Sequence, residues 1–109
     1  MRNIINLTPH TLNVHTHGEV LNIPASGSLA RVASEYFKLK YTADYGVDLF
    51  TCVYGEVEGL PPYRPSSNTL YVVSGIVKSA VPNRPDVVSP GQLIRDENGK
   101  PVGCKGLRR

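Results

Sequence analysis

The sequence predicts a mainly β (α+β) protein: a small barrel- or sandwich-like β domain with one short helix that follows a central strand. Short stretches of alternating polar and apolar residues recur along the chain, and glycine, proline, asparagine or serine separates them. Only one segment, near residue 77, has apolar residues at helical spacing, and it is short. The 109 residues are enough for a single domain, which we expect to span residues 1–109.

The first part of the chain alternates as strands do. We expect a strand at residues 2–7, ended by Pro9, and a hairpin formed by strands at 11–15 and 19–23. A fourth strand is expected at residues 29–33. Residues 34–45 fit neither a helical nor a strand period, so they are expected to be an irregular connection, with a strand inside it as the alternative.

The middle of the chain contains its most β-prone stretch, residues 47–54, which is rich in β-branched and aromatic side chains. Gly55 is expected to bend this strand. Residues 59–68 contain three prolines and are expected to form a stiff, exposed loop. The uninterrupted apolar run at 70–73 predicts a central strand that is buried on both faces.

A short helix is predicted directly after that run. Ser74 is suited to be its N-cap, and Pro82 ends it. Further on, residues 92–95 and 100–104 predict a hairpin, with Gly99 at a turn position that needs a positive φ. The last residues, 106–109, are expected to be a mobile basic tail.

Charge is distributed unevenly along the chain. Residues 1–60 have four basic and six acidic side chains, a net charge of −2, whereas residues 61–109 have eight basic and three acidic ones, a net charge of +5. Because side chains of like charge on one surface attract counter-charges, the basic half points to an anionic partner. A solvated surface with a basic tail is the alternative.

The joint between the central strand and the helix is the first candidate site. Free N–H groups at a helix start, next to Gly75, could hold an anion, and Arg84 and Arg95 could supply bidentate donors if they fold toward Ser74. Tyr71 or Tyr63 could stack on a base. In the alternative, Ser74 caps an ordinary helix and the two arginines pair with Asp86 and Asp96.

Other chemistries have less support in the sequence. His15 and His17 supply two metal ligands, but nothing nearby completes a set of three or four, so no metal and no cofactor is expected. His17 is expected in the turn of the hairpin. A thiol–imidazole pair of Cys104 and His10 would need contact that a sequence cannot show. Nucleic-acid binding would rest on charge alone, because no binding motif accompanies it.

Several segments together resemble a known group of proteins: Asn6-Leu7-Thr8-Pro9-His10, residues 55–61, Leu70-Tyr71-Val72-Val73-Ser74, Arg84-Pro85-Asp86, Pro90-Gly91, Arg95-Asp96, Gly99 and Gly103-Cys104. The chain is similar to small accessory proteins of tailed phages and prophages, a group to which no activity is attached. The match covers most of the chain and is weakest at residues 34–46. Its polar positions are His10, Arg31, Ser74, Arg84, Asp86, Arg95 and Asp96. Asp86 and Asp96 could equally hold turns by accepting a backbone N–H two residues on.

The resemblance implies a phage protein that acts in the cytosol of a bacterial host, as counter-defence factors of this length do. We expect a binding protein that sequesters an anionic ligand such as a nucleotide second messenger, with Ser74, Gly75, Arg84, Arg95, Tyr71, Tyr63, His10 and Arg31 as the candidate ligand-binding residues. A homo-oligomer is expected, since so small a core leaves little room for a pocket. Two alternatives remain: an inhibitor that occludes a host protein, and a nucleotide-directed hydrolase or transferase. No apolar run is long enough to span a membrane.

Overall fold

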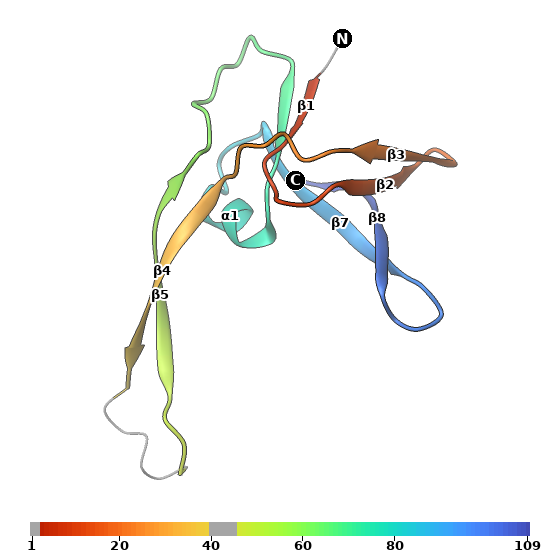
Figure 1. Ribbon diagram of the computed structural model, residues 1–109. Coiled ribbons are helices and arrows are strands. Elements are labelled where there is room, and N and C mark those ends of the chain that lie inside the picture. The colour runs from red at the N-terminus through yellow and green to blue at the C-terminus, as the bar shows by residue number, and fades with distance from the viewer. Residues whose placement is uncertain (1–2, 40–45) are drawn as a thin grey trace.

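The computed structural model describes residues 3–39 and 46–109 and shows a mainly β fold with one short helix (Figure 1). Its elements are β1 (Asn3–Asn6), β2 (Leu12–Thr16), β3 (Glu19–Ile23), β4 (Arg31–Lys38), β5 (Phe50–Glu58), β6 (Thr69–Val72), α1 (Gly75–Ala80), β7 (Val87–Arg95) and β8 (Pro101–Arg108). The predicted fold class is therefore confirmed.

Six strands form a curled half-barrel sheet in the order β1-β6-β7-β8-β2-β3. β6 is parallel to both of its neighbours, β1 and β7, and β8 is parallel to β2, whereas the β2–β3 and β7–β8 pairs are antiparallel. Parallel neighbours need a crossover connection, and α1 makes it between β6 and β7. The helix is thus a consequence of the sheet topology.

A buried amide closes the curl of this sheet. Asn6, at the end of one edge strand, is 1% exposed, and its Nδ2 donates to the carbonyl oxygens of His10 (2.7 Å) and Ile23 (3.1 Å). Ile23 ends β3, the opposite edge strand. The Oδ1 atom of Asn6 accepts from the N–H and the hydroxyl of Thr8, at 2.9 and 2.6 Å. One side chain therefore joins the two edges and fixes the β1–β2 loop.

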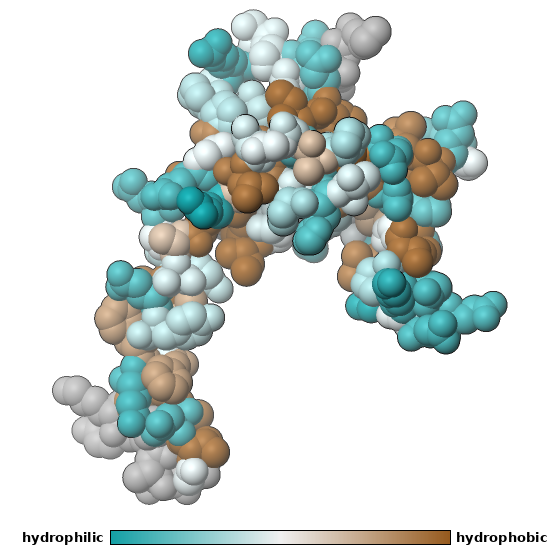
Figure 2. Space-filling model, in the orientation of Figure 1, coloured by the Kyte–Doolittle hydropathy of each residue, from teal (hydrophilic) through white to brown (hydrophobic). Residues whose placement is uncertain are grey.

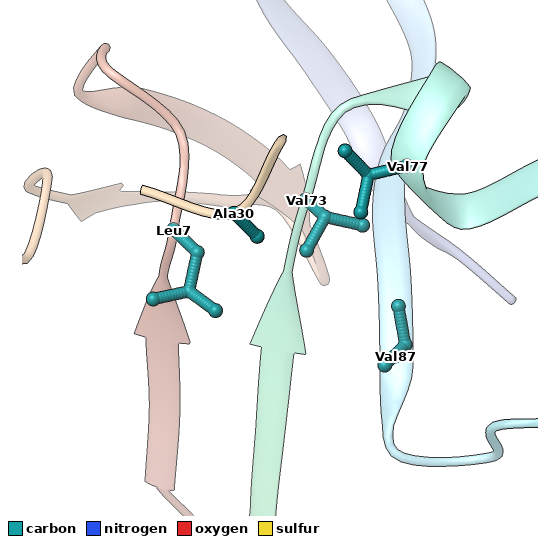
Figure 3. Packing of buried hydrophobic residues seen from close by; sticks show 5 residues of the cluster. All are labelled: Leu7, Ala30, Val73, Val77 and Val87. Carbon is teal, nitrogen blue, oxygen red and sulfur yellow. The ribbon is translucent and has the colours of Figure 1, made fainter. Parts of the chain in front are cut away.

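The hydrophobic core is thin and lies beneath the helix. Its buried cluster consists of Leu7, Ala30, Val73, Val77 and Val87 (Figure 3). Val77 brings α1 onto the sheet, and Val73 and Val87 have no exposed surface. The Oγ atom of Ser74 accepts from the N–H of Val77 at 3.4 Å, so the predicted N-cap is confirmed.

The remaining two strands form a separate ribbon. β4 and β5 pair only with each other among the described strands, and the ribbon projects away from the six-stranded sheet (Figure 1). We call its outer part, residues 34–39 and 46–54, the arm. Near its base the register shifts between Val32 and Ser34, opposite Gly55, so the bend expected at Gly55 is a bulge inside a strand that continues to Glu58.

The structure also extends two other predicted strands. β4 runs to Lys38, because each of residues 34–38 is paired with β5, so a strand lies within residues 34–45, as the alternative expected. β7 runs without a break through Pro90 and Gly91. The hairpins β2–β3 and β7–β8 are confirmed. Residues 106–108, expected as part of a basic tail, belong to β8, where Arg108 is paired with Ser89.

Candidate functional site

Arg84 and Asp86 form the best-defined polar cluster of the described residues. The carboxylate of Asp86 accepts from Nε and Nη2 of Arg84, both at 2.8 Å, and Nη2 also donates to the carbonyl oxygen of Pro61 at 2.9 Å. The ring of Tyr63 lies 5.7 Å from the guanidinium carbon. The side chains of Arg84 and Asp86 are only 20% and 10% exposed, so the pair is shielded from water.

The pairing changes the protonation equilibria of both groups. The hydrogen bonds from Arg84 lower the pKa of the Asp86 carboxyl, although its burial acts in the opposite direction. The hydrogen bond with Asp86 raises the pKa of Arg84. Both groups are therefore charged at neutral pH, and each neutralises the other.

A small hollow lies beside this pair, with a volume of about 180 Å³. Tyr63, Asn68, Thr69 and Asp86 are among its lining residues. The hollow is smaller than the roughly 300–1,000 Å³ that is typical of ligand pockets, and the charge that it presents is the carboxylate of Asp86. The volume is too small for a nucleotide, and the carboxylate repels an anion.

The other predicted site residues are distributed over the fold. Tyr71 joins the Arg84 cluster, and its N–H donates to the carbonyl oxygen of Asp86 at 2.8 Å. Arg95 lies at the far end of β7, about 25 Å of strand beyond Val87, and its Nη1 donates to the carbonyl oxygen of Gly99 at 2.8 Å. The guanidinium groups of Arg84 and Arg95 therefore do not converge on the start of α1, in contrast to the expectation.

Ser74 and Gly75 begin a helix of six residues, and the Ser74 hydroxyl is engaged as the cap. Arg31 is an exposed residue at the start of β4, paired in register with Glu58. His17 occupies the β2–β3 turn with a φ of 50°, as expected. No group of three or more metal-ligating side chains occurs within residues 3–39 and 46–109. No helix of that part of the chain is long and apolar enough to cross a membrane.

Of the predicted site residues, His10 lines a concave surface that is larger than the hollow at Asp86. It lines a groove of about 670 Å³ that crosses β7, β8 and the start of β2. Residues of these strands make up most of its lining: His10, Thr11, Leu12, Asn13, Pro90, Leu93, Lys100, Pro101, Val102, Gly103 and Cys104. We call this surface the groove.

The strand pairing explains the apolar floor of the groove. β8 lies between β7 and β2, and Cys104 is paired with Leu93 on one side and with Val14 on the other. Val102 is the extra residue at a register shift in the β7–β8 ladder, and it lines the groove together with Leu93 and Cys104. Leu93 and Val102 are 51% and 44% exposed, and no other described element covers them. Apolar side chains that lie together and exposed in a groove often mark a binding site.

The rim of the groove is polar, and its backbone is held rigidly. Asp96 Oδ1 accepts from the N–H groups of Asn98 and Lys100, both at 2.9 Å, which fixes the turn from which Lys100 extends. At His10, the carbonyl oxygen accepts from Asn6 and from Thr8. The groove thus combines an apolar floor with one lysine and one histidine, on backbone that is already ordered.

Sequence reasoning identified His10 but missed the floor of the groove. The sequence predicts Leu93, Lys100 and Val102 only as parts of the hairpin at residues 92–95 and 100–104. Leu93 is followed by Ile94, and Val102 lies between Pro101 and Gly103, so the sequence does not show whether the two side chains share a face or whether that face is covered. The sequence matches no family model, no curated protein and no solved structure.

Proposed function

We propose that the protein is a binding protein for a small anionic ligand with a flat or apolar body, such as a nucleotide, and that the ligand lies in the groove. The observation that carries this proposal is the combination of a concave apolar floor with Lys100 and His10 at its rim. The apolar body of the ligand covers Leu93 and Val102, and its negative charge lies near Lys100.

The volume of the groove supports a ligand of this kind. At about 670 Å³ it falls within the range of small-molecule sites, whereas the hollow at Asp86 does not. The net charge of +5 in residues 61–109 favours the approach of an anion toward this half of the chain. The resemblance to phage accessory proteins supplies a setting, namely the removal of a nucleotide signal from the cytosol of an infected bacterium.

Arg84 has a different part in this proposal. Its guanidinium group already donates to Asp86 and to the carbonyl oxygen of Pro61. We therefore assign to Arg84 a structural role, which is to hold residues 61–86 together, and no contact with the ligand. The anion contact is assigned instead to Lys100, which extends from an ordered turn.

Titration calorimetry with ATP, GTP and cyclic di-GMP tests the proposal. We expect at least one of them to bind, and we expect Lys100→Ala to weaken its affinity about three- to tenfold, because an exposed charge contributes only about 0.7–1.4 kcal/mol. Leu93→Glu, which places a negative charge on the floor, should weaken it more. Lys105→Ala is the matched control, since this exposed lysine follows Cys104 in β8 and points to the other face.

Chromatography of the ligand after heat denaturation completes the test. Recovery of the unchanged nucleotide supports sequestration, and recovery of an altered nucleotide would contradict it and favour an enzyme. The absence of binding by all three nucleotides would also contradict the proposal. So would an equal effect of Lys100→Ala and Lys105→Ala, because the affinity would then depend on general surface charge.

A further inference from the structure

The arm exposes an unusual number of large apolar side chains. Seven of them are 44–72% exposed: Tyr36, Phe37, Leu39, Val47, Phe50, Val53 and Tyr54. In Figure 2 hydrophobic residues recur along the projecting ribbon, away from the six-stranded sheet. A two-stranded ribbon is marginally stable in water by itself, and it normally gains stability from further strands or from packing against another element.

Both faces of the arm carry these side chains. The pairs Glu35–Val53 and Phe37–Thr51 place Val53 and Phe37 on one face. The pairs Ser34–Tyr54, Tyr36–Cys52 and Lys38–Phe50 place Tyr54, Tyr36 and Phe50 on the other. A ribbon that had one solvated face would be polar on that face, so the pattern is that of a ribbon covered on both sides.

The accessible surface area of the chain indicates how much more surface it exposes than a compact monomer does. The accessible surface is 8139 Å², whereas a compact monomer of this mass exposes about 5,900 Å². The radius of gyration is 17.2 Å, against about 13 Å for a compact domain of this length. The excess of roughly 2,200 Å² per chain is as large as the area that a chain loses in an obligate dimer.

The base of the arm provides a place for an apolar partner. A concavity of about 320 Å³ lies between Tyr54 of β5 and Ile76, Ser79 and Ala80 of α1. Ile76 is 56% exposed there. The face that carries Tyr54, Tyr36 and Phe50 thus continues onto the outer side of α1. Together the arm and the helix form one apolar concave surface, which we call the angle between arm and helix.

We infer that the occupant of this angle is the arm of a second copy of the chain. Two copies related by a two-fold axis each place their arm against the arm and helix α1 of the other, so that one copy covers Tyr54 and Ile76 of its partner and receives the same contact in return. This assembly removes apolar surface from both faces of each arm. It involves no residue of the groove, so it is independent of the proposed ligand.

Light scattering of the whole chain over a range of concentrations tests this inference. We expect a mass of twice 11.9 kDa at the higher concentrations. Phe37→Lys and Tyr54→Lys, one on each face of the arm, should each shift the mass toward 11.9 kDa. Val20→Lys, at a 56% exposed apolar position on β3, is the matched control and should leave the assembly unchanged.

Hydrogen exchange of the unaltered chain keeps the inference testable if an arm variant fails to fold. Amides of residues 34–38 and 50–54 should become more protected as the concentration rises. A single-copy mass at every concentration, with arm amides that exchange freely, would overturn the inference and leave a different protein as the partner. An assembly that both arm variants leave intact would overturn it as well. Lys100→Ala should lower the affinity for the ligand without changing the mass of the assembly. Ligand binding and assembly are therefore tested separately, and one can fail without the other.

Discussion

Replacing Arg84 by alanine removes the cation from a shielded ion pair and leaves its partner behind. Asp86 is a residue of 8% exposure, and both of its carboxylate oxygens depend on Arg84 for their hydrogen bonds. The carbonyl oxygen of Pro61 loses a donor in the same variant. The expected result is a less stable protein with an intact fold.

The size of the loss follows from this burial. Breaking a buried pair by removing one partner typically costs about 3–5 kcal/mol, because an uncompensated charge remains. The Arg84 side chain is 20% exposed, so water can reach part of the vacated space, and we expect a value near the lower end, about 3 kcal/mol. That is a large fraction of the roughly 5–15 kcal/mol by which a domain of this size is stable.

Urea denaturation followed by circular dichroism measures this loss. Lys38→Ala is the matched control, because the Lys38–Asp48 pair has a similar distance, 3.1 Å, but side chains that are 57% and 58% exposed. An exposed pair contributes about 0–1 kcal/mol, so this control should change the free energy of unfolding little. A double variant, Arg84→Met with Asp86→Leu, should recover part of the loss, since neither charge is then left unpaired.

The same pair predicts how stability depends on pH. Because Arg84 lowers the pKa of Asp86 in the folded state, the unfolded chain takes up a proton at that carboxyl first as the pH falls. The contribution of the pair is therefore complete above the ordinary pKa of an aspartate, about 4, and is lost as the pH decreases through the lower pKa of the folded state. In Arg84→Ala this part of the pH dependence should disappear.

Two results would refute this reasoning. One is a loss of stability in Arg84→Ala that is no larger than the loss in Lys38→Ala. The other is a parent protein and an Arg84→Ala variant whose free energies of unfolding fall in parallel between pH 5 and pH 2.

Two further predictions concern Asn6, whose side chain bonds the backbone, and Gly91, where the neighbouring backbone leaves no space for a side chain. Asn6→Ala removes four hydrogen bonds from a 1% exposed site and should cost about 3 kcal/mol in urea denaturation, and a cost below 1 kcal/mol would show that the amide does not close the sheet. Gly91→Ala places a Cβ on the carbonyl oxygen of Lys105 across the β7–β8 ladder and should lower the melting temperature by several degrees. Gly75→Ala, where a Cβ meets no atom within 4 Å, is its control and should leave the melting temperature unchanged or raised.

Local features of the fold could be predicted where the chemistry is local. The N-cap at Ser74 and the Gly99 turn depend on neighbouring residues, and both are found, the latter with a φ of 80°. The side chain of Asp96 accepts the N–H of Asn98, as expected for an aspartate that holds a turn. Asp86 does not hold its turn in this way; it pairs with Arg84, as the alternative interpretation expected, because the arginine supplies two stronger, charged donors.

Long-range features were less accessible. Residues 34–38 follow no strand period, since both faces of the arm are apolar, and only their pairing with β5 defines them as a strand. The positions of Arg84 and Arg95 at opposite ends of β7 depend on that strand continuing through Pro90 and Gly91, two residues that a sequence-based interpretation treats as a break. The groove requires β8 to lie between β7 and β2, and no local pattern encodes that order.

The strand order also has a consequence for synthesis of the protein. β8 follows all the other described strands in the sequence, yet it lies inside the sheet and joins the early hairpin β2–β3 to β7. β1 likewise pairs with β6, which follows it by more than sixty residues in the sequence. Until residues 101–108 have been made, the strands described within residues 3–38 can form only the β2–β3 hairpin, and the sheet assembles once β8 is added. Shortening the chain by these few residues should therefore prevent the whole sheet from forming.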